Sequence, residues 1–182
     1  MLCTSLRVLV PQRNCYIIKR ISALDTYFKQ YLIDFLRYNE EANIKLLASI
    51  QKLPEQEESV RLFSHCIAAQ NKWMNRITKE KSDSEYQWSA QSYLLNELET
   101  KWKESIGQWI RLLEQREEAS LNKSIEFTRQ TDGKKFGAAL KDIVLQINYH
   151  CIHHRAQINR IIRQQGLTPP ATDYILSALK EL

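Results

Sequence analysis

The chain of 182 residues is most economically a single domain, long enough to bury a sizeable hydrophobic core. Hydrophobic residues make up 43% of it, with only four glycines and four prolines, a composition that favours long helices joined by few loops. Four of the five surplus positive charges lie within residues 1–20, so the remaining chain is nearly neutral and lacks the broad basic surface that nucleic-acid binding requires.

The spacing of the cysteines and the length of the apolar runs predict a cytoplasmic protein. Cys3, Cys15, Cys66 and Cys151 have no C-x-x-C spacing, which predicts reduced thiols in the cytoplasm. No apolar run approaches the ~20 residues that span a bilayer, so we expect no membrane segment. Residues 1–21 are basic and show no signal-peptide cleavage pattern; we interpret them as a flexible N-terminal extension, with an organelle-targeting arm as the alternative.

Two long helices are predicted in the first half of the chain. Apolar residues recur at helical spacing from about residue 22 to 53, and Pro54 ends this pattern. A second helix is predicted after residues 54–57, whose acidic side chains suit a helix N-terminus, and it extends to about Ile77. His65 lies inside this second helix.

A third helix and a β excursion follow. Residues 79–89 are polar and are predicted to be a loop, and residues from 94 to about 119 again repeat apolar side chains at helical spacing. Residues 124–128 alternate polar and apolar side chains, and Thr131-Asp132-Gly133 is a turn signal. We therefore expect a short strand or hairpin at this point.

The last long helix is predicted over residues 138–165. It ends at Gly166, with prolines behind it, which is typical of a helix C-terminus. Residues 173–182 are predicted to form a short final helix. The expected fold class is all-α, a four-helix bundle with a short hairpin or loop before the last long helix, and a bundle core is a known place for metal sites.

The histidines form the strongest chemical signal. Successive residues of an α-helix turn by about 100°, so His150 and His154 lie about 40° apart on one face of the last helix. Two imidazoles in this arrangement can bind one metal ion, and His65 from another helix would complete a three-histidine site with open positions, as in catalytic metal sites. Chance clustering of surface histidines on a helix is the alternative.

Four segments of the chain together form a recognisable pattern. They are residues 38–43; His65 with Trp73 and Arg76; Asp132-Gly133 through Phe136; and His150-Cys-Ile-His-His154-Arg155-Ala156-Gln157 with Gly166, Pro169, Pro170 and Asp173. These segments resemble the DinB family of metalloenzymes over about residues 22–182, and the last of them, which contains the double histidine, is the most specific.

The resemblance implies a four-helix bundle, often a homodimer, in which His65, His150 and His154 hold a divalent transition-metal ion, with Zn and Ni the leading candidates. His153 belongs to the double-histidine pattern but is not a usual ligand of the family. At i+3 it lies about 60° from His150, so we interpret it as a neighbour of the site or an interface residue, and as a ligand only by second choice.

The remaining residues of the motif leave alternatives open. Cys66 and Cys151 each follow a candidate ligand directly, about 100° further around the helix, and should face neighbouring helices; a ligand or redox role is the less favoured reading. Arg155 and Gln157 have either a packing or solvent-facing role or a role near the site.

The resemblance also implies a class of reaction. Relatives suggest transfer or isomerisation with a low-molecular-weight thiol and an electrophilic substrate, and a bound ion would suit it by lowering the pKa of a coordinated thiol or water. A thiol S-transferase is expected first, with a hydrolase as a further possibility. No catalytic base stands out; the polar candidates are His153, Asp173, Glu40 and Glu41. The competing hypothesis is a non-enzymatic stress-response or interaction module with a structural or sensory metal.

Overall fold

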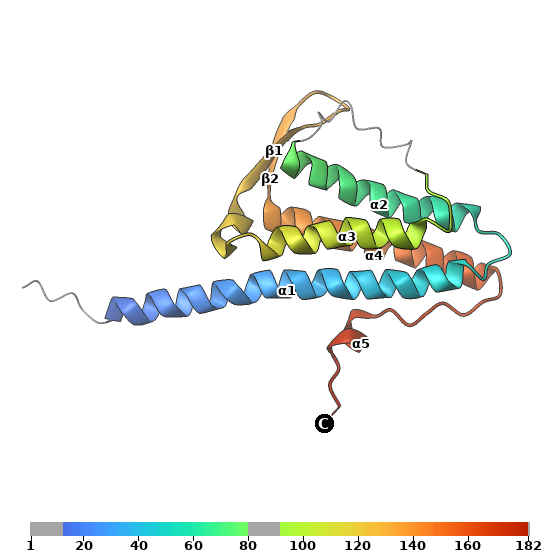
Figure 1. The fold of residues 1–182 in the computed structure, drawn as a ribbon, viewed down its shortest axis with the longest axis horizontal. Helices are drawn as coiled ribbons and strands as arrows, with labels where there is room; N and C mark the ends of the chain where they lie inside the picture. The colour runs from blue at the N-terminus through green and yellow to red at the C-terminus, as the bar shows by residue number, and fades with distance from the viewer. Residues whose placement is uncertain (1–12, 80–91, 182) are drawn as a thin grey trace, which may run out of the picture.

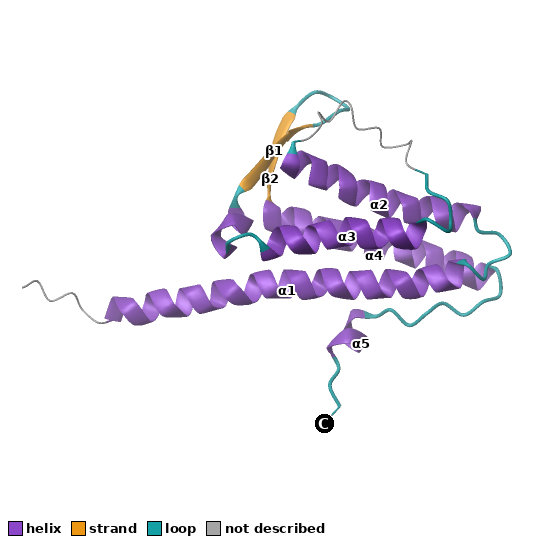
Figure 2. Ribbon diagram, in the orientation of Figure 1, coloured by secondary structure: helices purple, strands orange, loops and turns teal. Residues whose placement is uncertain are grey.

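A computed structural model describes residues 13–79 and 92–181, and this part of the chain is mostly helical with one small antiparallel sheet (Figures 1 and 2). In chain order the elements are α1 (Arg13–Ile50), α2 (Glu57–Thr78), α3 (Leu98–Glu114), the 3-10 helix η1 (Glu118–Asn122), β1 (Ser124–Thr128), β2 (Lys135–Ala139), α4 (Leu140–Gln164) and α5 (Tyr174–Ala178).

Helix α1 begins at Arg13, well before the residue 22 that the apolar pattern suggested. No glycine or proline occurs between Pro11 and Pro54, so nothing interrupts the helical hydrogen bonds over this stretch. Residues 13–21, expected to belong to an N-terminal extension, therefore continue α1. Residues 1–12 lie outside the described part of the chain.

Helix α2 matches its predicted position, and α3 is shorter than predicted at both ends. At its start, the Leu94 backbone N–H donates to the Glu97 carboxylate at 2.9 Å, which fixes a turn where the helix was expected to begin. At its end, α3 stops at Glu114, and a separate 3-10 helix follows after residue 117. The loop predicted over residues 79–89 lies outside the described residues except for Lys79.

The predicted hairpin is confirmed. Strands β1 and β2 pair antiparallel with Phe127 opposite Phe136, and Gly133 adopts φ +67° in the turn, where a side chain would be strained. Because β2 takes residues 138 and 139, helix α4 begins at Leu140 and not at Ala138.

Each of the four long helices packs against two others. Helix α1 contacts α3 and α4, and α2 contacts the same two helices, so all four surround one apolar core (Figure 1). Trp102 and Trp109 of α3 and Phe63 of α2 are among the largest fully buried side chains. This packing places α2 beside α4 and thereby brings His65 next to the double-histidine segment.

The C-terminal segment returns to α1. The Tyr38 hydroxyl donates to the Thr172 carbonyl at 2.7 Å, and the Tyr174 ring packs edge-on against Phe35 and Tyr38. These contacts hold the segment that follows α4 against α1.

None of the helices within the described ranges has both the length and the hydrophobicity needed to cross a membrane.

Candidate metal centre

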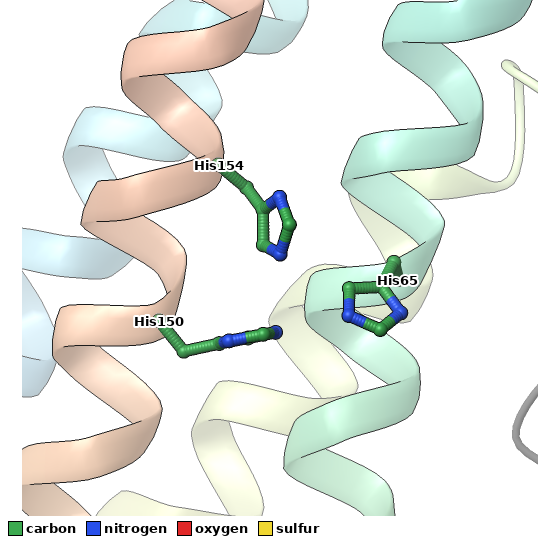
Figure 3. A group of neighbouring side chains, drawn as sticks. All are labelled: His65, His150 and His154. Carbon is green, nitrogen blue, oxygen red and sulfur yellow. The ribbon is translucent and has the colours of Figure 1, made fainter.

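Three imidazole rings from two helices turn toward one another in the structure (Figure 3). His65 comes from α2, and His150 and His154 lie one turn apart on α4. The ring centroids of His150 and His154 are 4.5 Å apart, and His65 lies 5.0 Å from the first and 4.9 Å from the second. One ring nitrogen of each residue lies within 4.8 Å of the other two, close enough for a shared metal ion.

The environment of the His150 Nε2 atom is compatible with metal binding by this donor set. It is buried and has no hydrogen-bond partner among the described residues. A buried polar atom without a partner costs about 1–3 kcal/mol, so such atoms are rare unless something else satisfies them. Coordination of an ion by this nitrogen, together with His65 and His154, would supply the missing interaction.

Gln157 orients the third imidazole. The Nδ1–H of His154 donates to Oε1 of Gln157 at 2.8 Å, which leaves Nε2 of His154 as the nitrogen able to bind metal. The Gln157 amide nitrogen donates in turn to Nε2 of His153 at 3.1 Å. Gln157 therefore has the role near the site that the sequence left open, and His153, exposed and outside the group of three, contacts the site through it.

All three imidazoles favour the neutral form. Burial, followed by the positive charges of His154, His65 and His153, lowers the pKa of His150 to about 4. Burial is also the main cause that lowers the pKa of His65 and of His154, and the nearby Arg61 charge contributes to both. At neutral pH the rings thus present lone pairs, the form in which histidine binds metals.

The family model for the DinB family matches residues 26–181, a range that contains all three histidines. The chain belongs to the DinB family. Comparison with curated proteins and with solved structures found no match. The resemblance drawn from the motifs is therefore confirmed.

The two cysteines that follow candidate ligands in this DinB chain lie in its core, as their helical positions predict. Cys66 and Cys151 are both buried, and neither belongs to the histidine group. The Gln70 amide donates to the Cys151 sulfur at 3.5 Å, and the hydrogen bond between the two thiols raises the pKa of Cys66. Their polar contacts are with side chains of α2, α4 and α1, the last through Asn39.

Arg155 has the packing role. Its side chain is buried and donates to the Tyr38 hydroxyl at 2.7 Å and to Oδ1 of Asn39 at 3.3 Å. It thus ties α4 to α1, and the same tyrosine holds the C-terminal segment. Sequence reasoning missed these partners, although residues 38 and 39 open the first segment that carries the family resemblance.

Three of the four candidate catalytic bases lie away from the histidine group. The Glu40 carbonyl accepts from Trp102 of α3 at 3.2 Å, and the Asp173 charge acts on Tyr38 and Arg155. Glu41 is exposed on α1 and belongs to neither the histidine group nor the groove beside it. Of the four candidates, only His153 adjoins the histidine group.

A groove of about 490 Å³ opens beside the metal centre between α2 and α4. His65 and His154 line it, whereas the Nε2 atom of His150 is buried beneath. Sequence reasoning missed the charged side chains of this groove, although two of them stand four and seven residues before His65 and therefore share its helical face. They are Glu58, Arg61 and Arg160.

Proposed function

We propose that this DinB protein binds a divalent transition-metal ion through His65, His150 and His154 and uses it as an enzyme acting on a low-molecular-weight thiol. The observation that carries the proposal is the unpaired, buried Nε2 atom of His150 beside two further neutral imidazoles. Three protein ligands leave an open coordination position, the arrangement of catalytic metal sites. The groove lined by His65 and His154 gives a small molecule access to it.

The bound ion would lower the pKa of a thiol or water at the open position. The chain's own contribution is to hold the three nitrogens, with Gln157 fixing the ring of His154. Imidazole ligands suit Zn, Ni, Cu and Fe alike, and of these we propose Zn or Ni as the resident metal.

The groove favours thiol transfer or isomerisation over hydrolysis. Among the described residues its only carboxylate is Glu58, which accepts two hydrogen bonds from Arg61 at 2.6 and 2.7 Å. Many metallohydrolases place a carboxylate as general base beside the metal-bound water. A thiol whose pKa the metal has lowered needs no such base, and it can lose its proton to solvent through the open groove.

The proposal is tested with cobalt-substituted protein and a small thiol such as 2-mercaptoethanol. Entry of the thiol should produce a sulfur-to-cobalt charge-transfer band, which should bleach when an electrophile such as an alkylating maleimide consumes the thiol and recover on adding more thiol. His150→Ala treated in the same way is the control. A parent protein that gives no band would contradict the thiol chemistry and favour the alternative, an interaction module with a structural or sensory metal.

We further propose that the four long helices form a four-helix bundle of the DinB type and that the protein is a cytoplasmic homodimer. Support for self-association comes from the aromatic cluster around Phe35, whose ring contacts include the exposed side chains of Tyr31, Tyr149 and Tyr174. Light scattering of the parent and of Tyr149→Glu tests the dimer, because a charge within this cluster should favour monomers.

A further inference from the structure

The groove beside the metal centre has the size of a small-molecule site and an uneven distribution of charge. Its volume of about 490 Å³ lies within the range of roughly 300–1,000 Å³ that ligand pockets occupy. Apart from the two histidines, its polar lining consists of Glu58, Arg61, Gln157, Arg160 and Gln164.

The two arginines differ in how much of their charge is available. Arg61 is paired with Glu58 through Nε and a terminal nitrogen, so most of its charge is balanced within its own helix. Arg160 is exposed on α4 and has no carboxylate partner among the described residues. The groove therefore carries one uncompensated guanidinium, and a guanidinium is well suited to bind a carboxylate through two parallel hydrogen bonds.

This charge lies close to the metal centre. Arg160 lines the same groove as His65 and His154, so its guanidinium faces the same space as two of the three candidate ligands. Three neutral histidines would leave the charge of a divalent ion uncompensated, which adds to the attraction for anions.

We propose that Arg160 binds a carboxylate of the substrate while the substrate's sulfur occupies the open metal position, so that the substrate is a carboxylate-bearing thiol. This inference rests on the proposed function and adds a substrate class to it.

A second groove of about 720 Å³ limits how far this preference extends. It shares Glu58, Arg61, Ile161 and Gln164 with the first groove but is also lined by Glu55, which precedes α2, and by Glu57 at its first position. The surface thus changes from positive beside the histidines to negative further along. Only a ligand whose anionic group lies within reach of Arg160 gains affinity. A ligand with negative charges along its whole length does not.

Two thiols of equal length test the proposal, 6-mercaptohexanoate and 6-mercapto-1-hexanol, which differ only in the terminal carboxylate. Each is titrated into cobalt-loaded protein, and the charge-transfer band gives its dissociation constant. The carboxylate thiol should bind about fivefold more tightly, the upper range for an exposed ion pair, and the difference should shrink as salt is added.

Arg160→Gln should reduce this preference to less than about twofold without changing the affinity for the neutral thiol. Arg163→Gln is the matched control, because Arg163 is also exposed on α4 but does not line the groove. Since both side chains are exposed, the variants should fold and keep their cobalt, which metal analysis checks.

The outcomes separate the two proposals. If neither thiol gives a band, the proposed function fails. If both give a band with equal affinity, or if the carboxylate preference survives in Arg160→Gln because the carboxylate binds the metal itself, the subsite is overturned and the proposed function stands. Loss of the preference in Arg163→Gln would also overturn the assignment to Arg160.

Discussion

Oε1 of Gln157 lies 2.8 Å from Nδ1 of His154, so one side chain of α4 decides which nitrogen of a candidate ligand faces the metal centre. A carbonyl oxygen can only accept, and the proton must therefore reside on Nδ1. The same amide also holds His153 through its nitrogen. Partners of this kind fix the tautomer and the orientation of a metal-binding histidine.

Gln157→Leu should therefore weaken metal binding about 10- to 100-fold without abolishing it, because His154 can still coordinate once its ring has been ordered. Competition with a chromophoric chelator measures the affinity. Gln164→Leu, on the same helix and in the same groove, is the control and should bind like the parent. Unchanged affinity in Gln157→Leu would show that the hydrogen bond does not orient the ligand.

The metal-free protein should lose stability as the pH falls from about 6.5 toward 4. The pKa of His150 is about 4 in the folded protein, against an ordinary value of 6.5, so the unfolded chain binds more protons within this window. Allowing for solvent screening, the loss from His150 is of order 1–2 kcal/mol. Urea unfolding at several pH values measures it, and His150→Gln should show a flatter profile; an identical profile would contradict the assignment.

Arg155→Met should destabilise the fold by about 1–3 kcal/mol, because it removes the buried donor to the Tyr38 hydroxyl and one of the two donors to the Asn39 amide oxygen, which keeps its hydrogen bond from Asn43. Metal stoichiometry should stay at the parent value, since Arg155 contacts α1 and not the three histidines. Thermal unfolding measures the loss of stability, and elemental analysis measures the metal stoichiometry. Loss of metal in a variant that remains folded would assign Arg155 to the site.

The protein should remain helical without metal. Its apolar core is formed by α1 to α4 and includes the fully buried Trp102 and Trp109, so burial of these side chains supplies the driving force for folding. Circular dichroism in the presence of a chelator should keep the helical signal. Collapse to a random coil would make the metal structural and would favour the non-enzymatic alternative.

Periodicity alone predicts that His150 and His154 share a helical face, because that relationship depends only on the turn per residue. It also predicts the hairpin and that Cys66 and Cys151 turn away from the metal centre. The groove could not be predicted in this way, since Arg61 and Arg160 become neighbours of the same space only when α2 packs against α4. The roles of Gln157 and Arg155 likewise depend on which partner lies within hydrogen-bond reach after packing. The start of α1 was predicted too late because residues 13–21 were assigned to a basic N-terminal extension, although no glycine or proline separates them from the rest of the helix.

Metal stoichiometry of single histidine variants tests the central claim most directly. After loading with excess Zn or Ni and dialysis, elemental analysis should find about one ion per chain in the parent protein and in His153→Ala, whose side chain lies outside the group of three. His65→Ala, His150→Ala and His154→Ala should each lose most of the metal while remaining folded. Parent-level metal in all three of these variants, or a loss in His153→Ala as large as theirs, would contradict the three-histidine centre.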